Sequence, residues 1–322
     1  MQHSDSPASA ALARFNALSE ALRVESPKPD KMGAAFTALA LLRAEGEDAA
    51  LIAQTKRNRA AFNDALGGGR SPTGSLRWVY AAVLAAQQVD PARFLRLRDT
   101  LRETRKQVKS PGLYAGGSRA ALVLCLADAN DTGAVRRFFE LKTGLTPPWW
   151  RSNSMVTDTY AAAHAATQTP LAKVQADRAR AEEVFKADRI ARNYRRDAAK
   201  LCVLLDREPN AVLARFQALE TARRESRTLR SRSDRGLAMS WAVEGLTVEE
   251  LPALEAIIEA LPRHLSSTGF ARARIAGQIL TADRPGEPVE TVAALTAVIA
   301  AQTAAMAAII AASTVATTTA TS

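Results

Sequence analysis

Residue types that perform nucleophilic or acid–base chemistry are scarce in this chain of 322 residues. The cysteines and histidines are Cys125, Cys202, His3, His164 and His264. A catalytic thiol needs a basic partner such as histidine to form its thiolate, but no motif links either cysteine to a histidine. Both cysteines lie in apolar runs, LVLCLA and KLCVLL, and no secretory signal pattern precedes them. We therefore expect two reduced core cysteines in a cytoplasmic protein.

Paired carboxylates are a second source of acid–base chemistry, and acidic neighbours occur at Glu182 and Glu183 and at Glu249 and Glu250. Catalysis needs two such groups directed into one pocket. Neighbouring residues on a helix point in different directions, so we do not expect these carboxylates to be paired in space. No metal-ligand spacing occurs either. The sequence favours a protein that uses no catalytic residue, metal or cofactor.

The run LGGGRSPTGS, which contains Arg70, has consecutive glycine amides that suit an anion nest. It lacks the Lys-Ser/Thr pair of a phosphate-binding P-loop and does not follow a strand. A flexible connection between helices is the favoured interpretation, and phosphate binding is the alternative.

Basic residues form the strongest pattern, in a chain of net charge +10. Residues 91–109 carry seven bases against two acids, residues 189–235 carry thirteen against six, and residues 236–290 are net acidic. The helical spacing of three and four residues places side chains on one face. The candidate partner-binding residues in these stretches are Arg98, Arg102, Arg105, Lys109, Arg223, Arg227 and Arg230. A solvated helix face is the alternative for each stretch alone.

Two adjacent tryptophans in the loop TPPWWRSNS add a further candidate site. Trp149 or Trp150, together with Arg151, could stack on a ligand, a base or a partner protein. The alternative is that one of these rings fills a gap between helices.

A duplicated segment of twelve residues indicates which helices carry these side chains. LARFNALSEALR begins at Leu12, and LARFQALETARR begins at Leu213. The apolar residues Leu12, Phe15 and Leu18 correspond to Leu213, Phe216 and Leu219 and share one helical face. Leu22 extends that face in the first copy. We interpret both copies as the second helix of a repeated helix pair.

Regular breaks between apolar helical runs support this interpretation. Each break combines a helix end with the Pro, Asp, Asn or Thr that favours a new helix start. The breaks lie at Pro7, Gly46, Asp90, Asp131, Pro170, Pro209, Thr247 and Gly286, about 39 residues apart. Gly-, Pro- and Ser-rich joints separate the units, and none is long enough for an interdomain linker.

Three segments follow from this pattern. Residues 1–322 form a single array, residues 1–23 form an N-terminal cap helix, and residues 287–322 form an Ala/Thr-rich closing helix and tail that is uncharged after Glu290. The tail is long enough to cross a bilayer, but it lacks the dense Leu, Ile and Phe and the flanking aromatic belt of a membrane span. We expect a soluble closing helix, with a membrane anchor as the alternative.

The stretches ELKTGLTPPWW, FKADRIARNYRRDAAKLCVLL and TAVIAAQTAAMAAIIAAS, in this order, resemble a bacterial family called domain of unknown function four thousand and three. The resemblance covers the last two-thirds of the chain. It implies an all-helical bacterial protein and transfers no activity or catalytic residue.

Together these observations predict an all-α protein, a right-handed superhelical stack of about seven helix pairs. We expect a non-catalytic scaffold for an acidic protein partner or for self-association, with basic middle units meeting acidic C-terminal units. The alternative is binding to nucleic-acid phosphates, as in a helical-repeat DNA-repair enzyme. Equivalent helices pack about 8 to 10 Å apart, so the basic helices ending near Lys109 and Arg230 should lie about 30 Å apart on the same side.

Overall fold

A computed structural model describes residues 7–67, 71–110, 112–127, 130–146, 154–262, 265 and 269–282. Every regular element within these ranges is a helix. The prediction of an all-α protein is therefore confirmed. The uncharged tail and the tryptophan loop lie outside the described residues.

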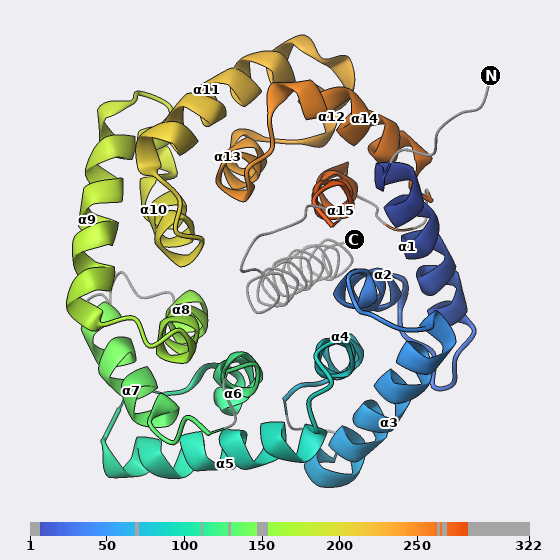
Figure 1. Ribbon diagram of the computed structural model, residues 1–322, viewed down its shortest axis with the longest axis vertical. Helices are drawn as coiled ribbons and strands as arrows, with labels where there is room; N and C mark the ends of the chain where they lie inside the picture. Colours follow the sequence, from blue (N-terminus) through green and yellow to red (C-terminus); the bar gives the residue numbers. More distant parts are fainter. Residues whose placement is uncertain are drawn as a thin grey trace, which may run out of the picture.

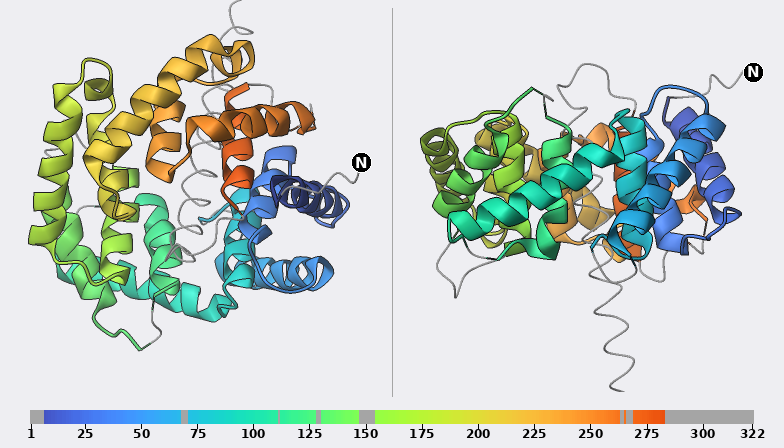
Figure 2. Two further views of the ribbon diagram at one scale, coloured as in Figure 1. Left: turned by 45° about the horizontal axis from the view of Figure 1, so that its top comes forward. Right: turned by 90° about the horizontal axis from the view of Figure 1, so that it is seen from below.

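The helices form a ring of two concentric layers, one outer and one inner (Figure 1). The outer helices are α1 (Pro7–Arg23), α3 (Asp48–Leu66), α5 (Pro91–Gln107), α7 (Ala134–Leu145), α9 (Leu171–Ala187), α11 (Pro209–Glu225), α12 (Arg227–Arg232) and α14 (Leu251–Ala260). The inner helices are α2 (Lys31–Leu41), α4 (Ser75–Ala86), α6 (Ser118–Cys125), α8 (Ser154–Ala166), α10 (Arg195–Leu204), α13 (Arg235–Glu244) and α15 (Gly269–Leu280). Three short 3-10 helices, η1 (Tyr114–Gly117), η3 (Ala191–Asn193) and η4 (Val248–Glu250), precede α6, α10 and α14. Seen edge-on, the ring is flat (Figure 2).

The predicted breaks mark the starts of outer helices. α5 begins at Pro91, where Asp90 accepts a hydrogen bond from the Ala92 amide, and α11 begins at Pro209, capped by Glu208. Before the turn, the Val89 amide donates to Leu84 O, which closes the preceding helix through a left-handed residue at Gln88. Starts of the long outer helices recur about every 40 residues. The break at Gly286 lies outside the described residues.

An Arg-Phe dipeptide recurs in four outer helices and joins each to the inner helix that follows. The phenylalanines are fully buried, and each arginine donates to carbonyl oxygens at the end of that inner helix. The pairs are Arg14–Phe15 with Leu42 O (3.0 Å), Arg93–Phe94 with Ala127 O (2.7 Å), Arg137–Phe138 with Ala165 O (3.3 Å) and Arg215–Phe216 with Ala242 O (2.8 Å). The phenylalanine fills the space between the layers, while the guanidinium binds carbonyls at the helix end, where Ala165 O and Ala242 O also accept a backbone amide.

The duplicated twelve residues are two copies of this device. Both copies lie in outer helices, α1 and α11. Phe15 and Phe216 are buried at the same position, and Leu18 and Leu219 follow one turn later. Leu12 and Leu213, which begin the two copies and were expected on the same face, are both only half-buried.

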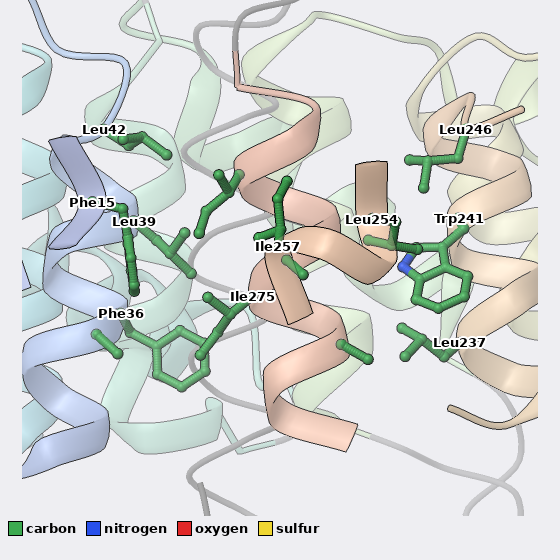
Figure 3. Close-up of a cluster of buried hydrophobic side chains, with 14 of the residues drawn as sticks. Phe15, Phe36, Leu39, Leu42, Leu237, Trp241, Leu246, Leu254, Ile257 and Ile275 are labelled. Carbon is green, nitrogen blue, oxygen red and sulfur yellow. The ribbon is translucent and has the colours of Figure 1, made fainter. Parts of the chain in front are cut away.

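The first and last described helices meet and close the ring. α1 and α2 contact α15, and one hydrophobic cluster contains Phe15 and Phe36 together with Ile275 and Trp241 (Figure 3). A Cβ atom at Gly277 would lie 2.7 Å from Trp241 Nε1, so glycine permits α15 to approach the indole. Outside the cluster, Arg43 donates to the Thr281 carbonyl.

Ring closure overturns one geometric expectation. The sequence placed the helices ending near Lys109 and Arg230 on the same side, but α5 and α12 lie on opposite sides of the ring (Figure 1). Each unit is rotated with respect to the preceding one, and the rotation accumulates over the intervening units. The two basic helices are therefore separated by the full width of the ring.

The inner helices run in the same direction. Ser75 at the start of α4 donates to Asp30 at the start of α2, and Ser118 at the start of α6 donates to Ser71 O at 2.7 Å. At the opposite ends of the inner helices, α5, α7 and α11 each begin beside the end of one inner helix. The arginine of the Arg-Phe pair in each then donates to the end of the following inner helix. We call the side where the inner helices begin the N face, and the side where they end the C face.

Candidate functional site

The residues with catalytic potential are either buried without a catalytic partner beside them or bonded to residues that stabilise the fold. In the described ranges, no group of three or more His, Cys, Asp or Glu residues is placed to hold a metal ion. Cys125 and Cys202 are free and buried, and burial raises the pKa of each thiol to about 12. Both thiols are therefore protonated near neutral pH and are poor nucleophiles. Both are free core residues, as the sequence predicted, and they lie in the inner helices α6 and α10.

The acidic neighbours also have structural partners. Glu250 accepts a hydrogen bond from the Thr247 amide at 2.8 Å and completes a capping box at the start of η4. Glu182 pairs with Arg178, while Glu183 pairs with Lys186. These carboxylates are not directed toward each other, in agreement with the sequence analysis.

His164 lies inside α8 and is stacked on Tyr160, with ring centroids 6.4 Å apart. Burial lowers the pKa of its imidazole to about 4. The ring is therefore neutral near pH 7 and does not contribute to the positive charge of the protein.

A buried ion pair links the ends of α7 and α8. Lys142 donates to Asp158, and both side chains are almost completely inaccessible to solvent. The second carboxylate oxygen of Asp158 accepts a hydrogen bond from the Tyr114 amide at 2.8 Å. Burial raises the pKa of Asp158, although Lys142 opposes this shift. The Arg119 guanidinium lies 4.3 Å from the centre of the Tyr114 ring.

This ion cluster positions a connector rather than a substrate. Tyr114 begins η1, in which Ala115, Gly116 and Gly117 all have positive φ angles. The Asp158 carboxylate holds that turn against α8 because it accepts the Tyr114 amide. Lys142 and Asp158 also flank, in sequence, the segment that contains Trp149, Trp150 and Arg151. Those three candidate residues lie outside the described residues.

The first predicted basic stripe is only partly on the surface. Arg98 is buried in α5 and donates to Ser118 Oγ at 3.3 Å. The expectation that it shares an exposed face with Arg102, Arg105 and Lys109 is wrong, because its side chain turns inward to the start of α6. Arg102 and Arg105 are exposed, and Lys109 is exposed beyond the end of α5. Sequence spacing alone did not distinguish the inward-facing arginine.

In the second basic stretch, three arginines surround one buried carboxylate. Glu220 accepts hydrogen bonds from Arg223 Nε at 2.8 Å, Arg224 Nε at 2.7 Å and Arg235 Nε at 3.0 Å. Burial acts to raise the pKa of Glu220, but these three donors hold it below its usual value. Arg223 is itself buried and also donates to Ser233 O. It is therefore a structural residue, in contrast to its predicted role on the surface.

Arg227 and Arg230 remain as exposed candidates on α12. Within the described part of the chain, neither forms an ion pair. The connector between α9 and α10 adds two exposed arginines, Arg189 and Arg192, which the sequence analysis included in a basic stretch without naming them as candidates. Sequence reasoning could have found Arg189 and Arg192 from their position, because they lie in a connector that leads into an inner helix, as Arg227 does.

Charge separates between the two faces of the ring. In the described connectors that lead to the N face and in the first turns of the inner helices, the exposed bases are Lys28, Lys31, Lys109, Arg189, Arg192, Arg196, Arg227, Arg230 and Arg235. Exposed acids in the same places are Asp30, Asp197 and Asp234. The exposed acids in the described turns of the C face are Glu45, Glu47, Asp90, Asp206, Glu208 and Glu249, with Arg43 as the exposed base. The N face is therefore basic and the C face acidic.

The outer helices explain how this separation arises. Acidic residues stabilise the start of a helix, and basic residues stabilise its end. Glu208 illustrates the first effect, because the Ala211 amide donates to its carboxylate and lowers its pKa. Arg105 and Lys106 lie in the last turn of α5. Since outer helices begin near the C face and end near the N face, their preferred charges accumulate on opposite faces.

Comparisons with known proteins leave the family open: no family model, curated protein or solved structure matches the chain. The resemblance to domain of unknown function four thousand and three remains an expectation from the sequence. Among the described helices, none has the length and apolar character needed to cross a membrane.

Proposed function

We propose that this protein is a helical-repeat array, a right-handed stack of helix pairs that closes into a ring (Figure 1). The recurring starts of outer helices and the four Arg-Phe contacts support this assignment. An array of equivalent units provides a broad surface built from connectors, as binding scaffolds do. We also propose a cytoplasmic location, consistent with two free cysteines.

We further propose that the array is a non-catalytic scaffold that binds an acidic protein partner on its N face. The observation that carries this proposal is the exposure of Arg227 and Arg230 next to the arginine cluster around Glu220. Arg223 is held in place internally, whereas Arg227 and Arg230 form no ion pair in the described structure. Guanidinium groups bind carboxylates through two parallel hydrogen bonds, so this surface suits Asp- and Glu-rich segments.

The ring geometry favours protein over nucleic acid. One duplex would have to cross the whole ring to contact both predicted basic stretches, because α5 and α12 lie at opposite edges of it (Figure 1). The burial of Arg98 and Arg223 also removes two predicted phosphate contacts. Nucleic-acid binding, including the DNA-repair alternative, then becomes an outcome of the binding test.

The test compares a fluorescently labelled poly-glutamate peptide with labelled duplex and single-stranded DNA. Fluorescence anisotropy is measured from about 50 to about 200 mM salt, a range in which multi-phosphate binding changes by orders of magnitude. We expect the peptide to bind, and we expect Arg227→Gln with Arg230→Gln to weaken its binding about tenfold, equivalent to about 1.4 kcal/mol.

Arg96→Gln with Arg136→Gln is the matched control, because it removes two exposed arginines of outer helices α5 and α7. The control should bind the peptide as the unmodified protein does. Equal losses in both double variants would contradict a specific site on the N face and indicate attraction by net charge alone. Duplex binding tighter than micromolar near 200 mM salt, with no binding of the peptide, would replace the protein partner by nucleic acid.

A further inference from the structure

The two faces of the ring are complementary to each other. Lys28, Arg189, Arg192 and Arg227 lie exposed in connectors of the N face. On the other face, exposed acids occur in several successive turns, including Glu45 and Glu47 between α2 and α3. The charges are therefore distributed around each face rather than gathered in one place. With this distribution, the ring presents a basic surface on one side and an acidic surface on the other.

The inner helices add to this polarity. An α-helix carries a partial positive charge at its start and a partial negative charge at its end. The starts of the inner helices share the N face, as the contacts of Ser75 with Asp30 and of Ser118 with Ser71 indicate. Their ends share the C face, where Arg43 donates to the Thr281 carbonyl and joins the ends of α2 and α15. The dipoles of the inner helices thus have the same sign as the exposed side chains on each face, whereas the outer helices run the other way and reduce this effect.

We propose that a second copy of this chain is a partner of the N face, and that the acidic C face of that copy docks on it. This inference rests on the proposed function, because it identifies the acidic partner of the same surface. Head-to-tail stacking brings bases against acids and the starts of inner helices against the ends of others. A symmetric contact between two N faces places like charges together and is disfavoured.

Head-to-tail contact leaves one basic and one acidic face free on every pair. Such a heterologous interface continues into an open stack unless rotation closes it. The net charge of +10 opposes association, but this long-range repulsion is screened at about 0.1 M salt, where the Debye length is about 10 Å. Direct contacts between the faces are shorter than this length. At about 1 M salt the Debye length falls to about 3 Å, and the stack should dissociate.

Two variants separate the faces. Arg227→Glu with Arg230→Glu reverses charge on the N face, while Glu45→Gln with Glu47→Gln removes charge from the C face. All four side chains are exposed, and Glu47 makes no side-chain capping bond at the start of α3. Circular dichroism establishes that both variants retain their helix content. Arg96→Glu with Arg136→Glu, on the outer helices, is the control for charge reversal.

Sedimentation velocity measures the assemblies at about 0.1 M and about 1 M salt. We expect the unmodified chain and the control to form species larger than 34.5 kDa at the lower salt and monomers at the higher. Each face variant alone should be monomeric. An equal mixture should form dimers and nothing larger, because only one intact N face and one intact C face can meet.

A monomeric unmodified chain at both salt concentrations would overturn the stacking proposal. A second contrary result is that the unmodified chain assembles while the equal mixture of the two face variants stays monomeric. That result excludes head-to-tail contact. The peptide titration distinguishes this failure from failure of the proposed function. If the chain is monomeric but still binds poly-glutamate through Arg227 and Arg230, the proposed binding surface for an acidic partner stands. The proposal that a second copy occupies this surface then fails.

Discussion

The two basic stretches, residues 91–109 and 189–235, look alike in sequence but use their arginines differently. In α5, Arg93 caps the end of α6 and Arg98 is buried against its start. In the second stretch, Arg223 is buried beside Glu220, whereas Arg227 and Arg230 are exposed on a short helix in a connector. Position within the unit decides the difference: arginines between the layers complete the fold, and arginines in connectors remain available to a partner.

This difference also changes the meaning of the net charge. A buried guanidinium with several carbonyl partners contributes little to recognition, because its donors are already used. Arg272 is an example, since it donates to the carbonyls of Ile258 and Leu261 at the end of α14. Part of the arginine content therefore serves helix termini. The distribution of the exposed remainder between the two faces carries the functional signal.

The largest expected effect concerns the phenylalanine that accompanies a buried arginine contact. Phe216→Ala should destabilise the protein by about 3 to 5 kcal/mol, because Phe216 is 1% exposed and its removal leaves a cavity. Leu213→Ala, one turn earlier on the same helix, should cost less because Leu213 is half-buried. Urea unfolding measures both changes. Equal losses would contradict the assignment of Phe216 as the core residue of its unit.

The apolar periodicity made these units predictable. Breaks with Pro and capping residues predicted the starts of α5 and α11, and spacings of three and four predicted the buried faces of α1 and α11. The spacing did not predict ring closure, which depends on the rotation between successive units. It also did not predict the inward direction of Arg98, because Ser118, its partner, comes from the next helix. Both outcomes depend on contacts between elements.

Lys142→Met should break the buried ion pair at a cost of about 3 to 5 kcal/mol. The substitution leaves the Asp158 carboxylate buried without its cation, and an uncompensated buried charge is strongly destabilising. Lys142→Met combined with Asp158→Leu should recover part of this loss, because the unpaired charge is gone. Urea unfolding of the single and double variants is the measurement. If the double variant lost more free energy of unfolding than the two single variants lose together, a paired role would be contradicted.

His164 predicts a pH dependence with a defined sign. Its folded-state pKa is about 4, compared with about 6.5 in an unfolded chain. Between these values the unfolded state binds more protons, so stability should fall as the pH decreases through this window. The full loss is about 3 kcal/mol. His164→Gln should remove this component from unfolding curves measured between about pH 7 and pH 4; an unchanged pH profile would contradict a buried neutral imidazole.

The smallest effect gives the sharpest comparison, because it concerns two adjacent arginines of α7. Arg137 donates to the Ala165 carbonyl and pairs with Asp131, whereas the Arg136 side chain is 80% exposed and lies 3.7 Å from Glu140. Arg137→Met should destabilise the protein by about 1.5 to 3 kcal/mol through loss of a charged hydrogen bond, and Arg136→Met by less than about 0.5 kcal/mol. The two variants have the same net charge and composition, so any difference in their urea midpoints reports position alone. If both arginines cost the same, the distinction between structural and available arginines fails. The assignment of Arg227 and Arg230 to a partner would then lose its basis, because that assignment depends on the same distinction.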